Sequence, residues 1–215
     1  MRYMKLLGLG VMVFAIGATA LFGQGNQEAA NLTREGIEAS QAKDWDKAIA
    51  AFKRAAQLDE HYAPNLASAL QQRATVYVSQ GRFQEAVADY SEALKVKAKD
   101  PDILERRAYA EMQLKDYDKA LHDYNEAIKF SPEEPKYYQA RAFIYQTKGD
   151  FKAALADVDK ILTLDPNNQD ALQRKKFLEA KLHAPPTPPP TPSGPIPNPN
   201  LRPLATATDT PATKP

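Results

Sequence analysis

The side chains best suited to chemistry in this sequence are arginines and aspartates that recur in register. The recurring set is Arg73, Arg107 and Arg141 at one phase, with Asp89, Asp123 and Asp157 at another. A catalytic centre needs a nucleophile or a general acid or base placed once in a pocket, so a pair that recurs along the chain is better explained as a structural ion pair. It forms either within one unit or between the aspartate of one unit and the basic residue of the next. We favour the second arrangement, which also pairs Asp157 with Lys175.

Residues for most other chemistries are missing from the sequence. There is no cysteine, and the histidines, His61, His122 and His183, never cluster at the spacing of metal ligands. There is no Ser-His-Asp set, no pair of carboxylates in a wedge and no glycine-rich phosphate loop. With 28 basic and 27 acidic residues the net charge is +1, which gives no field to attract nucleic acid. We therefore expect no enzyme, no catalytic or metal-binding residue, no cofactor, no small-molecule substrate and no nucleic-acid partner.

A sequence repeat must position these charges. Its marker is an alanine that follows an aromatic residue by three positions. The marker alanines, Ala48, Ala86, Ala120 and Ala154, are separated by 38, 34 and 34 residues, and a fixed period near 34 is the signature of stacked helical repeats. Within each unit apolar residues recur at steps of three and four, which indicates two helices of about 14 residues and no strand. Prolines stand where first helices are expected to begin, at Pro64, Pro101 and Pro135.

The repeat resembles that of the tetratricopeptide repeat family. That family has a small residue in its first helix, an aromatic residue at the turn, the pattern Ala-x-x-x-aromatic-x-x-Ala in its second helix, and a closing proline. The fourth unit matches most fully, from Tyr138 through Ala142, Phe151 and Ala154 to Pro166. The resemblance covers about residues 29–168 in four units. It implies an all-α fold, a right-handed superhelical solenoid of antiparallel helix hairpins.

The resemblance also sets the expected domain boundaries. The repeats span about 29–62, 67–100, 101–134 and 135–168, and a capping helix spans 169–183, so that the repeat domain is 29–183. A signal peptide at 1–23 and a short linker at 24–28 precede it. Four extra residues, 63–66, are expected to lengthen either the turn between the first two repeats or the start of the next helix. A repeat array exposes its last apolar face unless a cap covers it, so Ala171, Leu172, Leu178 and Leu182 are expected to pack inward.

In the resembled family the first helices line an inner face that binds extended or helical peptides. One phase of these helices, Ile37, Thr75, Tyr109 and Phe143, forms a stripe that grows more aromatic along the array. An exposed apolar stripe rimmed by polar side chains suits a peptide groove. The predicted groove is Ile37, Gln71, Thr75, Val78, Glu105, Tyr109, Met112, Gln139, Phe143 and Gln146, with Thr33 and Gln41 beside Ile37. The alternative is that these side chains only contact the neighbouring first helix.

One binding mode of that family is not expected here. Members that grip the carboxylate tails of heat-shock chaperones use a Lys/Asn pair in the first repeat and further Lys and Arg residues later. The matching positions carry Thr33, Ile37, Gln72 and Gln139, none of which is cationic. The expected partner is therefore a protein or peptide that is not recognised through such a clamp.

The N-terminal segment has the composition of an export signal. Arg2 and Lys5 precede an apolar run at 6–22, and Ala18-Thr19-Ala20 lies near the end of that run. This is the order of regions in a secretory signal peptide. Cleavage is expected after Ala20 or Gly23. A retained membrane anchor is the alternative, although the run is at the short limit for a membrane span.

The C-terminal segment 184–215 holds 12 of the 17 prolines. A Pro/Thr-rich composition of this kind predicts polyproline II stretches in an otherwise disordered tail. Its expected role is either a Pro-rich ligand or spacer, or a solubilising tail.

Together these features predict an exported, non-enzymatic scaffold, periplasmic or secreted, that binds a protein or peptide partner in the concave groove of a solenoid. An uncleaved N-terminal segment would instead tether it to the membrane. The alternative function is a structural or assembly subunit of an envelope complex, acting through self-association or the cap.

Overall fold

The structure is a computed structural model that describes residues 25–183, and the regular elements of this part of the chain are helices. Residues 25–41 are helical. The elements that follow are α2 (Trp45–Leu58), η1 (Glu60–Tyr62), α3 (Ala63–Ser79), α4 (Phe83–Val96), α5 (Pro101–Gln113), α6 (Tyr117–Phe130), α7 (Pro135–Thr147), α8 (Phe151–Leu164) and α9 (Gln169–His183). The expected signal segment 1–23 and the Pro/Thr-rich segment 184–215 lie outside the described residues. Residues 25–28, expected to belong to a short linker, are helical.

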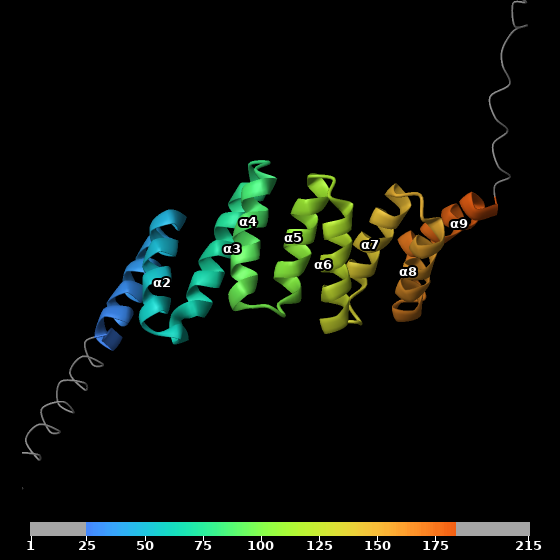
Figure 1. Ribbon diagram of the computed structural model, residues 1–215. Coiled ribbons are helices and arrows are strands. Elements are labelled where there is room, and N and C mark those ends of the chain that lie inside the picture. The colour runs from blue at the N-terminus through green and yellow to red at the C-terminus, as the bar shows by residue number, and fades with distance from the viewer. Residues whose placement is uncertain (1–24, 184–215) are drawn as a thin grey trace, which may run out of the picture. The chain divides into compact units, whose positions relative to one another are not determined.

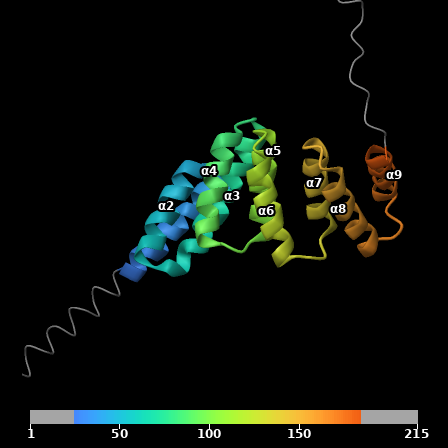
Figure 2. The same cartoon turned by 45° about the vertical axis from the view of Figure 1, so that its right-hand side comes forward.

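The helices form antiparallel hairpins that follow one another in a row (Figure 1). Each first helix packs against the second helix that follows it, and each second helix packs against the next first helix; Figure 2 shows the pairs α3–α4 and α7–α8 from a second direction. The predicted all-α solenoid of helix hairpins is therefore confirmed. Within residues 25–183 no helix is both long and apolar enough to span a membrane.

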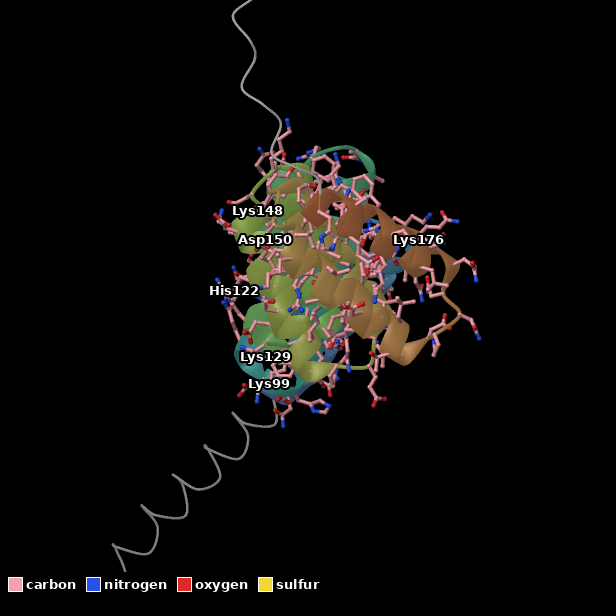
Figure 3. All side chains as sticks on the ribbon, turned by 90° about the vertical axis from the view of Figure 1, so that its right-hand side faces the viewer. Lys99, His122, Lys129, Lys148, Asp150 and Lys176 are labelled. Atoms are coloured by element: carbon pink, nitrogen blue, oxygen red, sulfur yellow. The ribbon has the colours of Figure 1, made fainter. Side chains whose placement is uncertain are left out.

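The repeat domain has two distinct edges. Hairpin turns lie along one edge and the turns between repeats lie along the other (Figure 1). Seen along the row, Lys148 and Asp150 lie at the edge with the hairpin turns, whereas Lys99 and Lys129 lie at the opposite edge (Figure 3). The first helices are residues 25–41, α3, α5, α7 and α9, and we call the surface they expose the first-helix face.

Small residues let the two helices of a hairpin approach closely. The marker alanines of the second helices, Ala48, Ala86, Ala120 and Ala154, are fully buried. The facing position of the first helices is Gly36, Ala74, Ala108 or Ala142, and these three alanines are also fully buried. At Gly36 even a methyl group would meet the Phe52 ring at 2.6 Å. The small positions therefore set the distance between the paired helices.

Each hairpin turn contains one residue in the left-handed backbone region. These residues are Lys43 (φ 59), Gly81 (φ 73), Lys115 (φ 62) and Gly149 (φ 80). Two residues later the second helix begins with its aromatic residue, Trp45, Phe83, Tyr117 or Phe151. In three of the four turns the intervening aspartate caps that helix, as where the Asp150 carboxylate accepts from the Ala153 N–H. The sequence motif that marks the repeat therefore builds a turn and a helix start.

The extra residues between the first two repeats are accommodated in α3. This helix has 17 residues, whereas α5 and α7 each have 13. A short 3-10 turn, η1, links α2 to it, and Pro64 lies in the first turn of α3, where a missing N–H leaves no hydrogen bond unmade. Of the two expected outcomes for residues 63–66, the longer start of the next helix is confirmed.

The left-handed turn residues give a matched test of the backbone. A Cβ added at Gly149 would meet no atom within 4 Å, so Gly149→Ala should destabilise the fold by about 1 kcal/mol through backbone strain alone. Lys115→Gly removes the same strain from the third repeat and should stabilise it by about 0.5–1 kcal/mol. Urea unfolding followed by circular dichroism measures both changes. Equal destabilisation by the two variants would contradict this explanation of the turns.

Candidate functional site

The recurring arginines and aspartates form ion pairs within single hairpins. The guanidinium of Arg107 donates from Nε to Asp123 Oδ2 (2.7 Å) and from Nη2 to Asp123 Oδ1 (2.8 Å). Arg73 and Asp89 form the same two-bond contact, as do Arg141 and Asp157. The aspartates are buried. These hydrogen bonds raise the pKa of each arginine above its usual value, with the aspartate as the largest cause.

The expectation that the aspartate pairs with the next repeat was therefore wrong. A different contact joins neighbouring repeats. Arg107 Nη1 donates to Ser91 Oγ of the preceding hairpin (3.0 Å), and Arg141 Nη1 donates to Asn125 Oδ1 (2.6 Å). In the cap, Lys175 Nζ lies 2.7 Å from Asp159 Oδ1 rather than pairing with Asp157. Each basic residue thus bonds to a residue 16 positions earlier, and the ion-pair set is structural in geometry.

The predicted aromatic stripe is exposed on the first-helix face. Ile37 is 46% exposed, Tyr109 45% and Phe143 48%, and Thr75 is also exposed. Large apolar side chains of a repeat core are normally covered by the next repeat, so exposure close to one half shows that neighbouring first helices do not cover them. The structure therefore favours a free surface over the alternative in which these residues only contact the neighbouring helix.

A hollow of about 500 Å³ lies in the middle of this face. It brings together four predicted groove residues, Thr75, Val78, Glu105 and Tyr109. Sequence reasoning missed its other lining residues, Tyr90, Asp102, Arg106, Tyr124 and Lys136. The phases of Tyr90 and Tyr124 assigned them to hairpin packing, and their rings are indeed buried. Their inclusion in the lining shows that second helices also reach this face.

The central hollow carries both charge signs. Lys136 Nζ lies 2.7 Å from Glu105 Oε2 and 3.4 Å from Asp102 Oδ1, and the hydrogen bond to Glu105 raises the pKa of Lys136. Burial, with a smaller contribution from Glu105, raises the pKa of Tyr124. The Tyr90 hydroxyl lies 3.3 Å from Thr75 Oγ1. At neutral pH the hollow therefore offers phenol hydroxyls, a lysine and carboxylates, which can hydrogen-bond a peptide main chain.

A second hollow of about 400 Å³ lies between α7 and α9. It contains the predicted residues Gln139 and Gln146. Its other lining residues, which sequence reasoning missed, are Asp170, Gln173, Arg174 and Phe177. Phe177 lies 34 positions after Phe143 and is 44% exposed, so the stripe continues onto the cap. The period itself was the signal that could have found it.

The remaining predicted residues do not line either hollow. Ile37, Gln71, Met112 and Phe143 lie on the first helices outside the two linings, with Ile37 and Phe143 exposed and the other two half-buried. Thr33 is buried, and its hydroxyl donates to the Ala29 carbonyl oxygen (2.8 Å), so it is not available to a ligand. The predicted set therefore divides into two hollows joined by exposed apolar side chains.

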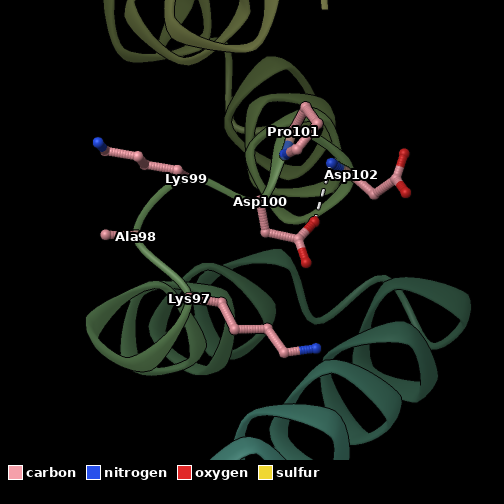
Figure 4. A pocket seen from close by; sticks show the side chains of 6 residues that line it. All are labelled: Lys97, Ala98, Lys99, Asp100, Pro101 and Asp102. Atoms are coloured by element: carbon pink, nitrogen blue, oxygen red, sulfur yellow. Dashed lines mark hydrogen bonds between the residues drawn. The ribbon is translucent and has the colours of Figure 1, made fainter. Parts of the chain in front are cut away.

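A third hollow lies at the turn between α4 and α5 and is lined by residues 97–102 (Figure 4). Asp100 is the N-cap of α5, and its carboxylate accepts from the Asp102 and Ile103 N–H groups. The hollow is the outer surface of an inter-repeat turn, and its aspartate is occupied by capping. It carries no convergent set of groups for chemistry.

The opposite edge carries a second apolar row that sequence reasoning did not identify. Leu58, Val96 and Phe130 are exposed large apolar residues, and each is the last residue of a second helix. We call them the apolar edge. Leu164 ends α8 at the same phase but is partly buried against the core. The repeat period again predicts their common position.

The described part of the chain contains no group of three or more His, Asp or Glu side chains arranged to hold a metal ion. Its shape is that of a helical-hairpin solenoid with an exposed aromatic stripe on one face. Three sequence models of the tetratricopeptide repeat match it, at residues 28–99, 72–135 and 135–168. The chain belongs to the tetratricopeptide repeat family. No curated protein sequence matches it significantly.

Solved structures agree with this assignment. A tetratricopeptide repeat protein from Parabacteroides merdae is 28% identical, with a TM-score of 0.57 over 73% of this chain and 60% of that one. The first tetratricopeptide domain of Spaghetti (RPAP3), bound to the HSP90 peptide SRMEEVD, is 25% identical, with a TM-score of 0.51 over 55% of this chain and 94% of that one. MamA, at 17% identity, has a TM-score of 0.56 over 73% and 83% and shows the fold alone.

The ion pairs give a test of their structural role. Arg107→Met leaves the Asp123 carboxylate, 3% exposed, without its partner, and should destabilise the fold by about 2–4 kcal/mol. The control is Lys175→Met, which removes one exposed surface pair and should change stability by less than about 1 kcal/mol. Urea unfolding of both variants measures the difference. Similar losses in the two variants would show that burial of Asp123 does not make this pair more important.

Proposed function

We propose that this protein is an exported, non-enzymatic scaffold that binds an extended or helical peptide segment of a protein partner along the first-helix face. The observation that carries the proposal is the exposure of Ile37, Tyr109 and Phe143 at one phase of successive first helices. Exposed apolar residues that line up over several elements mark interaction sites more often than scattered ones do. Aromatic residues are also the commonest anchors of protein interfaces.

The polar groups around the stripe support a peptide as the ligand. Gln139, Gln146, Glu105 and Lys136 line the two hollows beside the aromatic residues. Amide and charged side chains at these positions can pair with main-chain N–H and C=O groups of a bound segment. Binding sites of this type combine apolar anchors with a small number of placed polar groups.

A peptide-bound structural neighbour supports the same class of ligand. The Spaghetti domain carries an HSP90 peptide on a similar array of hairpins. Thr33, Ile37 and Gln72, however, stand where chaperone-binding members need cationic or amide clamp residues. We therefore propose a different peptide, recognised through the aromatic stripe and the polar hollows. Export rests on the signal-like composition of residues 1–23, which the described residues do not include.

A second candidate function is assembly. The apolar edge, Leu58, Val96 and Phe130, is exposed on a different part of the surface from the stripe. A row of this kind suits self-association or a permanent neighbour in a larger envelope complex. It is the observation that keeps an assembly subunit as the alternative to a peptide scaffold.

The stripe is tested by a double substitution. Tyr109→Ala with Phe143→Ala removes two exposed anchors and should weaken capture of a crosslinked partner by about 10- to 100-fold, because truncated aromatic hot spots usually lose about 1.4–2.8 kcal/mol or more. Helical circular dichroism should persist because neither ring is in the core. The measurement is quantitative crosslinking with the chain as bait in its native cells.

The matched control for the stripe is Leu58→Ala with Phe130→Ala, which removes two equally exposed apolar residues from the apolar edge. Capture should be retained in this control. Retention of the partner by the stripe variant, together with its loss in the edge variant, would contradict the groove and favour the edge.

Assembly through the apolar edge is tested by sedimentation. If the edge self-associates, the mass in solution should rise with protein concentration, and Leu58→Ala with Phe130→Ala should return it to that of a monomer. The stripe variant should leave the mass unchanged. A chain that remains a strict monomer at high concentration contradicts self-assembly.

A further inference from the structure

The cap helix α9 presents two different surfaces. Ala171 and Leu178 are buried against the last hairpin, and Leu178 is completely covered. On another side of the same helix Phe177 is 44% exposed and lines the hollow shared with α7. A helix that only closed the core would need the first surface and could be polar elsewhere. The exposed phenylalanine therefore indicates a second role for α9.

Arg174 stands beside Phe177 in that hollow and is not fully paired. Its Nη1 atom is buried and has no hydrogen-bond partner among the described residues. Asp170 lines the same hollow, yet no ion pair joins it to Arg174 among the salt bridges of residues 25–183. Arg107 and Arg141, in contrast, place Nε, Nη1 and Nη2 on acceptors.

A buried charged donor without a partner is unfavourable, and an incoming acceptor removes that penalty. A carboxylate is the acceptor that best matches a guanidinium, because the pair combines opposite charge with directed N–H donors. One guanidinium close to Asp170 provides too little positive charge for a dianionic phosphate. The glutamines at 139, 146 and 173 add neutral donors and acceptors around it.

We propose that α9 is part of the ligand-binding surface, and that the hollow between α7 and α9 takes an acidic side chain, Asp or Glu, of the bound peptide, with an adjacent apolar side chain of the peptide on Phe177. This inference rests on the proposed peptide-binding function and specifies the chemistry of its ligand. The carboxylate is assigned to a side chain because the first-helix face runs from the middle of the array onto α9, so a segment lying along it passes the hollow.

The probes are three small peptides that carry the same aromatic group. They are acetyl-Phe-Glu-amide, the uncharged acetyl-Phe-Gln-amide, and acetyl-Phe-Gln with a free terminal carboxylate. Saturation-transfer NMR with the full chain at low ionic strength, with peptide up to about 10 mM, measures their dissociation constants. The Glu amide should bind about five- to tenfold more tightly than the Gln amide, and salt should reduce that difference.

The variants are matched in charge. Arg174→Met should abolish the preference for the Glu amide, whereas Lys176→Met, which removes an exposed charge from the same helix outside the hollow, should retain it. Arg174→Met should also keep the helical circular dichroism and the unfolding midpoint of the parent, because no partner is left unpaired. Phe177→Ala should weaken both amides by a similar factor.

Several results would overturn this inference. They are equal binding of the two amides, a preference that survives Arg174→Met, or no binding of either amide at about 10 mM. Tighter binding of the free acid than of the Glu amide would assign the carboxylate to a chain terminus and overturn the side-chain assignment. The proposed peptide scaffold fails separately, when partner capture is unaffected by Tyr109→Ala with Phe143→Ala.

Discussion

The structure depends on the close approach of two helices at positions too small to separate them. Ala86, Ala120 and Ala154 are completely buried against the first helix of their own hairpin. In the first repeat Gly36 leaves room for the Phe52 ring alone. A single hairpin of this kind cannot bury its remaining apolar side, so the next hairpin must cover it. The same geometry places every first helix on one face, which is where the exposed aromatic residues gather.

The arginines hold this stack in register. Each one uses its planar fork of donors on the aspartate of its own hairpin and one further nitrogen on the hairpin before it, as Arg141 does with Asp157 and Asn125. Because the contacts on both sides are met by one rigid guanidinium, a shift of one hairpin against the next would break hydrogen bonds to a buried carboxylate. The first repeat has Glu35 instead, which pairs with the exposed Lys47. The exposed stripe is thereby held on a rigid support.

The period near 34 residues was enough to predict the hairpins, the small positions, the aromatic residue at each second-helix start and the phase of the stripe. It could not choose the partner of Asp123. Arg107 lies 16 residues before Asp123 and 16 after Ser91, so the same spacing occurs within a hairpin and between hairpins. Phe177 and Arg174 were missed because α9 was considered only for the residues that close the core. The apolar edge was missed because a last helical residue can be covered by the next repeat or left exposed, and spacing does not distinguish the two.

The central claim is that a partner lies on the first-helix face. It is tested most directly by a photo-crosslinking amino acid, p-benzoylphenylalanine, placed at Tyr109 or at Phe130 in the native cells. Each replaces an exposed aromatic residue by another of similar shape, one in the stripe and one at the apolar edge. The structure predicts a crosslinked protein from position 109 and little or none from position 130. Crosslinks from position 130 alone, or equal yields from both positions, would contradict a partner bound specifically to the stripe.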